Sequence, residues 1–408
     1  MNIIIALPAE MYILRPEANQ DIVKDTEEYN IYFKNIILPY REEFDIRVEC
    51  EYGSNYGEFW RISEFPYDCD SFPLTLAIYD DMGCRIAEKA CVVHLIDKKK
   101  SKEFAVMPIG DSMTHTTTCI GHAVSKLRNV QTRGLRSFDG HIHTEGRGGW
   151  SYTSYFNNVT ICWGGVSPFI FPRDVAGKDY YGDWDFEKMK QSDSRPTYSY
   201  DGFPVYELKD GMIYHKDGKL YRKEPETDVP VSENPEWEIS FAKYVERFQP
   251  GHIDAVSLLM GGNDLQVISY ENGDAVIEDY VNNTRKMIDA IWAYDPDIKI
   301  IINLPIIGAE QYAWGKRMHC FSSSKQYRFI VIKAAAALIS RFEGEKNIYI
   351  SATLLNLDPV FGFDKEPYRA NQYSDDYVMK QSNWVHPNAN GYKQMGDALA
   401  AVIEAIRP

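Results

Sequence analysis

From residue 104 onward, short apolar runs alternate with longer segments of helical spacing, and this order limits the folds open to the chain. The apolar runs span residues 104–109, 255–260, 298–304 and 347–351, and the helical segments span residues 279–293, 325–342 and 390–406. A strand inside a parallel sheet is apolar along its whole length because both of its faces are covered, and helices usually connect such strands. The order therefore predicts an α/β domain of three layers, with an open parallel sheet between helices.

The first hundred residues follow a different period. Apolar and charged side chains alternate over residues 44–50, and Leu74, Leu76 and Ile78 repeat the alternation. A period of two is typical of a strand with one buried face. The turn residues at 80–83 lead into a second apolar run at 84–96, which predicts a hairpin.

A chain of 408 residues is expected to form two domains, since one domain typically holds roughly 100 to 200 residues. We place a small all-β sandwich at residues 1–102 and the α/β domain at residues 103–408. Four lysines mark the predicted solvated linker: Lys98, Lys99, Lys100 and Lys102.

Bulk properties exclude several classes of partner. A net charge of −15 repels phosphate backbones, so no nucleic acid is expected. No stretch reaches the ~20 apolar residues of a membrane span, so no membrane is expected either. The apolar start at residues 3–7 is too short for a signal peptide, and the seven cysteines are scattered without the CxxC spacing of a metal site. These features favour free thiols and a cytoplasmic location.

Polar blocks stand where ligands bind in such sheets, beyond the carboxyl ends of the strands. Gly-Asp-Ser at 110–112 follows the first apolar run, and Gly-Gly-Asn-Asp at 261–264 follows the second. Asn-Trp-Val-His-Pro at 383–387 precedes the last helical segment.

In this order, the blocks resemble those of the SGNH (GDSL-like) hydrolases, which are GDS, a glycine in a Gly-rich turn, GxND and DxxHP. Gly-Arg-Gly-Gly-Trp-Ser at 146–151 matches the second block, with Gly149 in the key place. The resemblance covers residues 104–408 and depends on short motifs. It implies a three-layer α/β/α hydrolase domain, and the preceding β-sandwich is similar to two-domain carbohydrate esterases.

The resemblance also implies a role for each block. Ser112 is the expected nucleophile, exposed by a tight turn at Gly110, and His386 is the base that activates it. The expected oxyanion hole combines the Ser112 and Gly149 N–H groups with the Asn263 side chain. The neighbouring Trp150 and Trp384 are expected to bind substrate. No metal or cofactor is implied.

Each residue also has a purely structural alternative. Ser112 could cap the following helix, and His386 could cap or brace the last one. Asn263 could be a turn residue, and Gly149 could belong to a plain loop.

One block departs from the family pattern, because Asn383 stands where the family has an aspartate three residues before the histidine. Asparagine can accept an imidazole N–H but carries no charge to stabilise imidazolium. Three interpretations stay open: a dyad assisted by Asn383, a substitute carboxylate at Asp375 or Asp376, or an inactive homologue that only binds.

Two further features bear on the substrate. An insertion at about residues 164–250 is expected to shape the site, and turns at 210–211 and 217–218 predict a small meander within it. The tyrosines of this meander suit either sugar rings or their own packing: Tyr206, Tyr214 and Tyr221. The alternating His141, His143 and Glu145 could ligate a metal or simply pack, and the resemblance implies no metal.

The sequence thus predicts a serine esterase that hydrolyses short acyl esters, with acetyl groups on a carbohydrate as the expected substrate. A lipase or thioesterase of the same family is one alternative. A catalytically degenerate carbohydrate-binding protein is the other.

Overall fold

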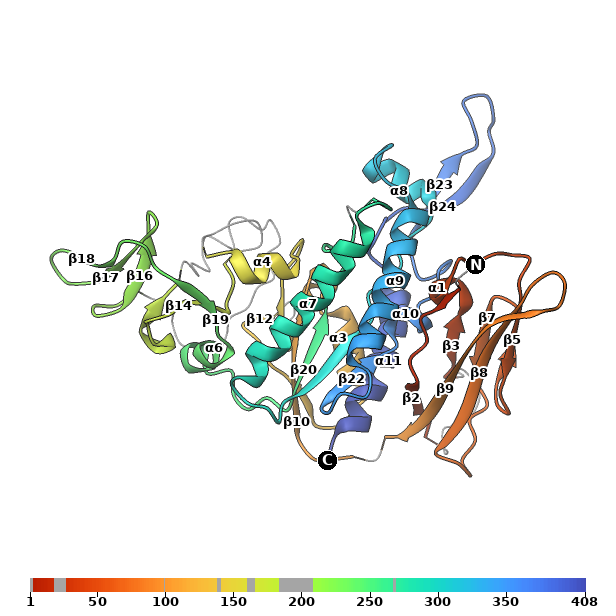
Figure 1. Cartoon of the computed structure of the whole chain (residues 1–408), viewed down its shortest axis with the longest axis horizontal. Coiled ribbons are helices and arrows are strands. Elements are labelled where there is room, and N and C mark those ends of the chain that lie inside the picture. The colour runs from red at the N-terminus through yellow and green to blue at the C-terminus, as the bar shows by residue number, and fades with distance from the viewer. Residues whose placement is uncertain are drawn as a thin grey trace.

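A computed structural model describes residues 3–17, 27–98, 100–137, 141–159, 166–182, 208–266 and 269–408. Figure 1 shows its N-terminal strands at one end, a central layered domain, and a group of short strands at the opposite end. Among the described residues, no helix is both long enough and apolar enough to span a bilayer.

The central domain is built on a sheet of seven strands in the order β12-β13-β10-β20-β21-β22, with β11 also paired to β10. Its strands are β10 (Phe104–Gly110), β11 (Val130–Thr132), β12 (Arg136–Ser137), β13 (His143–Gly146), β20 (Ala255–Leu259), β21 (Lys299–Asn303) and β22 (Ile348–Ser351). All neighbours are parallel except β12 and β13. The parallel sheet predicted from the four apolar runs is confirmed.

Helices cover both faces of this sheet. They are α2 (Ser112–His115), α3 (Thr118–Ser125), α4 (Tyr152–Asn157), α6 (Phe241–Phe248), α7 (Gly273–Trp292), α8 (Gln311–Met318), α9 (Ser324–Phe342), α10 (Thr353–Asn356) and α11 (Ala389–Ile406). The three predicted helical segments correspond to α7, α9 and α11. Helix α7 starts at Gly273, earlier than the predicted residue 279. Gly273 and Asp274 are unfavourable inside a helix, but its first turn tolerates both, so they do not delay its start.

The alternation of side chains along β10 explains the two covered faces. Met107 and Ile109 belong to the apolar cluster that includes Ile288 of α7 and Ile330 of α9. Val106 belongs to a second cluster formed with α3 and α11. Because successive side chains of a strand point to opposite faces, an entirely apolar β10 requires both layers of helices.

Two small sheets form the N-terminal region, as the predicted β-sandwich requires. One has the order β2-β9-β8-β5 and the other β3-β7-β6, beside the β1-β4 pair. The elements are β1 (Ile4–Ile5), β2 (Glu10–Arg15), β3 (Tyr29–Tyr32), α1 (Phe33–Ile36), β4 (Ile37–Leu38), β5 (Asp45–Glu49), β6 (Ser54–Asn55), β7 (Phe59–Ile62), β8 (Ser71–Tyr79) and β9 (Arg85–Asp97). The predicted hairpin is confirmed as the antiparallel pair of β8 and β9. We propose the domain boundary at residues 102 and 103, since β9 and β10 belong to different sheets.

The N-terminal region packs on the central domain through buried polar contacts. The Asn35 side chain donates to the carbonyl oxygens of Leu354 (2.8 Å) and Leu357 (2.7 Å) next to α10. The backbone N–H of Asn30 donates to Oδ1 of Asn356 at 3.0 Å. The two parts also share one apolar cluster.

The predicted linker is solvated at Lys102, which is exposed, whereas Lys98 and Lys100 are partly buried and Lys100 is held against α11. Lys100 donates its backbone N–H to Glu404 at 3.0 Å, and its ammonium group contacts the carbonyl of Ala405 at 3.2 Å. Glu404 in turn forms a buried ion pair with Arg407 at 2.6 Å. Lys100 lies there because the last carbonyl groups of a helix lack donors within the helix and attract nearby cations. Lys99 lies outside the described residues.

The insertion contributes the strands at the far end of Figure 1. They are β14 (Ile170–Pro172), β15 (Tyr180–Tyr181), β16 (Ile213–Lys216), β17 (Lys219–Arg222), β18 (Val229–Ser232) and β19 (Trp237–Ile239), with a 3-10 helix at Gly177–Asp179. The predicted turns at 210–211 and 217–218 flank β16. A last hairpin, β23 (Lys365–Arg369) with β24 (Tyr377–Gln381), precedes α11.

Candidate active site

The Gly-Asp-Ser block forms a sharp turn between β10 and α2. Asp111 is the N-cap of α2, and its Oδ1 accepts the N–H of Met113 at 2.9 Å. Ser112 is therefore the first helical residue and not the cap. A Cβ atom at Gly110 would lie 2.0 Å from Oγ1 of Thr114 and 2.4 Å from the carbonyl oxygen of Leu259. A glycine is thus required at position 110 because neighbouring atoms approach its backbone closely, and not because of a positive φ.

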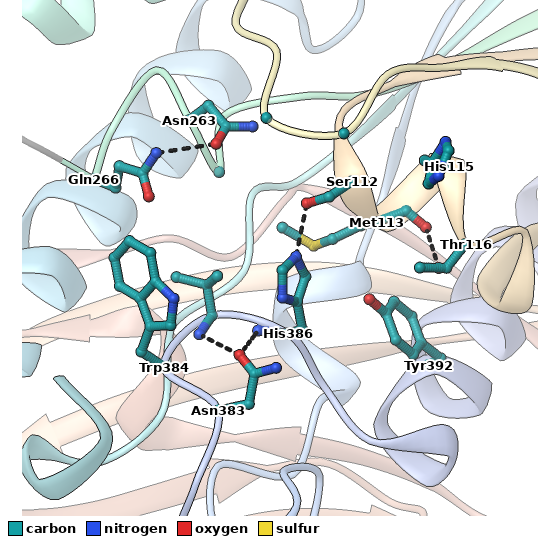
Figure 2. Close-up of a pocket in the computed structure, with 14 residues that line it drawn as sticks. Ser112, Met113, His115, Thr116, Asn263, Gln266, Asn383, Trp384, His386 and Tyr392 are labelled. Carbon is teal, nitrogen blue, oxygen red and sulfur yellow. Dashed lines mark hydrogen bonds between the residues drawn. The ribbon is translucent and has the colours of Figure 1, made fainter. Parts of the chain in front are cut away.

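The structure brings Ser112 and His386 together. The Oγ of Ser112 lies 2.7 Å from Nε2 of His386, and Figure 2 shows the two side chains pointing at one another. His386 does not cap α11, because Asn388 does so by accepting the N–H of Gly391 at 2.9 Å. The hydroxyl and the imidazole are placed as a nucleophile and its base require.

Asn383 holds the turn on which His386 stands. Its Oδ1 accepts the backbone N–H of Val385 at 3.3 Å and that of His386 at 3.1 Å. The sequence predicted instead a bond from this oxygen to the imidazole ring. These two bonds fix the position of the histidine through its main chain. The expected contact to the ring stays a prediction.

Neither alternative carboxylate lines the cavity that contains Ser112 and His386. Asp375 and Asp376 lie between β23 and β24, at the tip of the hairpin. The Asp375 side chain is fully exposed and lies 3.4 Å from Arg369. Asp376 accepts the hydroxyl of Ser374 at 3.2 Å. A charged hairpin tip is stable in water, whereas a triad carboxylate must reach the imidazole.

Asn263 and Gly149 face the same cavity as Ser112. The amide of Asn263 has a fixed orientation, because its Oδ1 accepts from Gln266 at 2.9 Å and its Nδ2 donates to the carbonyl of Trp150 at 2.9 Å. One hydrogen of Nδ2 remains for another acceptor. Figure 2 shows this nitrogen on the side of Asn263 nearer Ser112. Gly149 has a φ of 79°, which favours glycine.

Two buried carboxylates connect these turns. Asp111 accepts the N–H of Gly262 through Oδ2 at 3.1 Å, and Asp264 accepts the N–H of Tyr152, at the start of α4, at 3.0 Å. Burial raises the pKa of Asp111 to about 7 and that of Asp264 to about 6. Desolvation is the main cause in both, since water no longer stabilises the ionised form.

The cavity has a volume of about 440 Å³. Its walls are Ser112, Met113, His115, Thr116, Gly148, Gly149, Gly262, Asn263, Gln266, Asn383, Trp384, Val385, His386 and Tyr392. All three predicted blocks and the Gly-rich turn thus meet at one place, at the carboxyl edge of the sheet.

The two predicted substrate-binding tryptophans differ. Trp384 lines the cavity and packs edge-on against Trp314 at 5.0 Å between ring centroids. Trp150 is only 1% exposed and packs against Tyr155, so its ring is part of the core. The prediction for Trp150 is corrected: its carbonyl oxygen positions Asn263, while its indole is buried against Tyr155.

The alternating His141, His143 and Glu145 do not form a metal site in the described part of the chain. The Glu145 side chain is fully buried and accepts from the Tyr244 hydroxyl at 2.7 Å. It also forms a buried ion pair with Arg147 at 2.8 Å. This carboxylate therefore stabilises the turn before Gly149.

In the predicted meander, Tyr214 and Tyr221 stack on each other across β16 and β17, with ring centroids 5.9 Å apart. Neither tyrosine lines the cavity, so their contacts support the packing alternative. Tyr206 lies outside the described residues.

The sequence interpretation missed Asp111, Asp264 and Gln266 as positioning residues. Asp111 and Asp264 belong to the recognised blocks, so a search for carboxylates inside the motifs could have found them. Nothing in the sequence singled out Gln266, three residues after Asn263.

Comparisons with known proteins agree with the motif resemblance. Residues 227–394 match the model of the GDSL-like Lipase/Acylhydrolase family, which supports the predicted resemblance over that segment. The matched segment contains Asn263 and His386 but begins after Ser112 and Gly149. A search among curated proteins found no match.

Solved structures with a similar fold were found at low identity. A carbohydrate esterase family 3 protein from Talaromyces cellulolyticus is 12% identical, with a TM-score of 0.33, over 74% of this chain and 100% of that one. A possible lipase from Chitinophaga pinensis DSM 2588 is 13% identical, with a TM-score of 0.34, over 74% and 99%. A carbohydrate esterase family 2 enzyme with a carbohydrate binding domain, from Corynascus thermopiles (Myceliophthora fergusii), is 12% identical, with a TM-score of 0.33, over 93% and 92%.

Proposed function

From a chain whose residues 227–394 belong to the GDSL-like lipase/acylhydrolase family, we propose a serine esterase that removes short acyl groups, acetyl above all, from a carbohydrate. The observation that carries this proposal is the 2.7 Å contact between Ser112 Oγ and His386 Nε2, inside a cavity that Asn263 and Gly149 also line. Nucleophile, base and oxyanion donors are the parts that acyl transfer requires.

The first half of the reaction forms an acyl-enzyme. Ser112 Oγ attacks the ester carbonyl carbon while its proton passes to His386 Nε2, which accepts it in the tautomer protonated at Nδ1. The carbonyl oxygen becomes an oxyanion that accepts hydrogen bonds from the Ser112 and Gly149 N–H groups and from Nδ2 of Asn263. Collapse of this intermediate breaks the bond to the leaving alcohol, which takes the proton from His386.

The second half regenerates the enzyme. A water molecule gives a proton to His386 Nε2 and attacks the acyl carbon, and the resulting oxyanion uses the same donors. Its collapse releases the carboxylic acid and returns the proton to Ser112 Oγ. Asn383 supplies no charge in either half, so we propose a Ser112–His386 dyad whose histidine is positioned by the Asn383 turn.

Substrate preference separates this proposal from its alternatives. Turnover of p-nitrophenyl acetate, butyrate and octanoate is compared with release of acetate from acetylated oligosaccharides. We expect acetate to be the best of the three acyl groups, and acetylated saccharides to be hydrolysed. Preference for octanoate would indicate a lipase or thioesterase. Saccharide binding without any turnover would indicate a degenerate binding protein.

A further inference from the structure

A second cavity of about 450 Å³ adjoins the catalytic cavity. The two share three wall residues, Asn383, Trp384 and His386. The other walls of the second cavity are Ala313, Lys316, Arg317, Asp364 and Ser382. Most of these side chains are polar, whereas a pocket that binds a long acyl chain is lined mainly by apolar side chains.

The chemistry of the dyad indicates what this second cavity holds. His386 must deliver its proton to the oxygen of the leaving alcohol, so that oxygen has to reach hydrogen-bond distance of Nε2. The remainder of the leaving group then extends from His386 into neighbouring space. A cavity with His386 and Trp384 in its wall offers that space.

Arg317 is a cation in the wall of this cavity that is not paired with a carboxylate in the described part of the chain. Its guanidinium carbon lies 5.7 Å from the centroid of the Trp384 ring, and among the described residues no carboxylate forms an ion pair with it. Lys316, by contrast, is paired with Glu366. A guanidinium that lies over an aromatic ring keeps N–H groups available at its edge, where a planar carboxylate can accept two of them.

We infer that the second cavity is the leaving-group subsite of the proposed esterase, and that it binds a sugar whose carboxylate contacts Arg317. This inference rests on the proposed function. Asp364 also lines this cavity, and its carboxylate can accept a sugar hydroxyl. In a chain with a net charge of −15, an acidic sugar needs such a local cation to bind.

The test uses two acetylated methyl glycosides that differ at one carbon, a glucuronoside and a glucoside. Wild type should show a kcat/KM at least ~5-fold higher for the acidic ester, the size expected for one charge-assisted contact to an exposed arginine. Arg317→Gln should reduce this ratio to about one and leave the glucoside nearly unchanged. Arg317→Lys should restore part of the ratio. Arg341→Gln, which removes the same charge from α9 outside both cavities, should keep the wild-type ratio.

Two results would overturn the subsite. One is equal turnover of both esters by wild type, and the other is an equal loss on both esters in Arg317→Gln, which would mean that Arg317 only supports Trp384. A binding measurement on Ser112→Ala separates the subsite from the proposed function, because it needs no turnover. Arg317-dependent binding of methyl glucuronoside, by calorimetry, supports the subsite even where wild type hydrolyses no ester. Absence of that binding rejects the subsite even where p-nitrophenyl acetate is hydrolysed.

Discussion

The carboxylate of Asp111 accepts the N–H of Gly262 at 3.1 Å while it also caps α2. One buried side chain therefore connects the turn that carries Ser112 to the turn that carries Asn263. A Cβ on Gly262 would lie 2.7 Å from Oδ2 of Asp111, so the glycine is needed for this contact. The distance between the proposed nucleophile and the proposed oxyanion donor depends on it.

The burial of the Asp111 carboxylate predicts a pH dependence of stability. Burial raises the pKa of Asp111 from 3.8 to about 7 in the folded protein. Between about pH 4 and pH 7 the folded state keeps a proton that the unfolded state has released, so the free energy of unfolding falls as the pH rises. Above about pH 7 both states are ionised, and this contribution no longer changes.

Urea unfolding across this pH range, for wild type and Asp111→Asn, measures the effect. The variant cannot titrate at this position, so its curve should be flatter than that of wild type between pH 4 and pH 7. Part of the slope should remain, because the pKa of Asp264 is also raised, to about 6. Parallel curves for the two proteins would contradict the prediction.

The dyad predicts large losses at two positions. Ser112→Ala and His386→Ala should each lower kcat/KM for p-nitrophenyl acetate by at least ~10³-fold, because each removes a central member of the catalytic unit. Circular dichroism and thermal unfolding should show an intact fold in both. Near-normal turnover by Ser112→Ala would reject the whole assignment.

Asn263 should act through kcat. Removal of one oxyanion-hole donor typically costs about 10²- to 10³-fold, so we expect that loss for Asn263→Ala. Gln266→Ala should cost about 10-fold or less, because Gln266 orients the Asn263 amide and is not one of the proposed oxyanion donors. Steady-state kinetics on p-nitrophenyl acetate measures the loss of kcat in each variant. A larger loss for Gln266→Ala than for Asn263→Ala would contradict the assignment of Asn263 as the oxyanion donor and Gln266 as its support.

Asn383 should matter less than His386. Asn383→Ala loses the acceptor for two backbone N–H groups but no charge, so we expect kcat/KM to fall by about 10-fold or less, roughly 1.4 kcal/mol. Asn383→Asp keeps both acceptors and should be tolerated, and its negative charge should move the acidic limb of the pH–rate profile to higher pH.

Asp375→Ala provides the matched control, since it removes a carboxylate from the exposed hairpin tip. Its activity should equal that of wild type. If Asn383→Ala proved as damaging as His386→Ala, Asn383 would be a full triad member and the dyad would be wrong.

The layered fold could be predicted because its signal is local. Residues 104–109 are apolar throughout, and only a strand covered on both faces suits such a run. Trp150 shows the limit of this reasoning. An aromatic residue beside a glycine turn is equally compatible with a binding surface and with the core, and only the packing of Tyr155 against it decides. Asp111 could be singled out as a carboxylate inside a motif, but its partner Gly262 could not, because the two residues are far apart in the chain.

The polar bonds between the N-terminal region and α10 tie the folding of the two parts together. Asn35 satisfies two carbonyl oxygens of the central domain that would otherwise be buried without a donor. A hydrolase domain excised at residue 103 would lose that donor and expose the apolar surface beside it. A module exchanged between related proteins would therefore have to carry both sides of this contact, and the two parts should melt in a single cooperative transition.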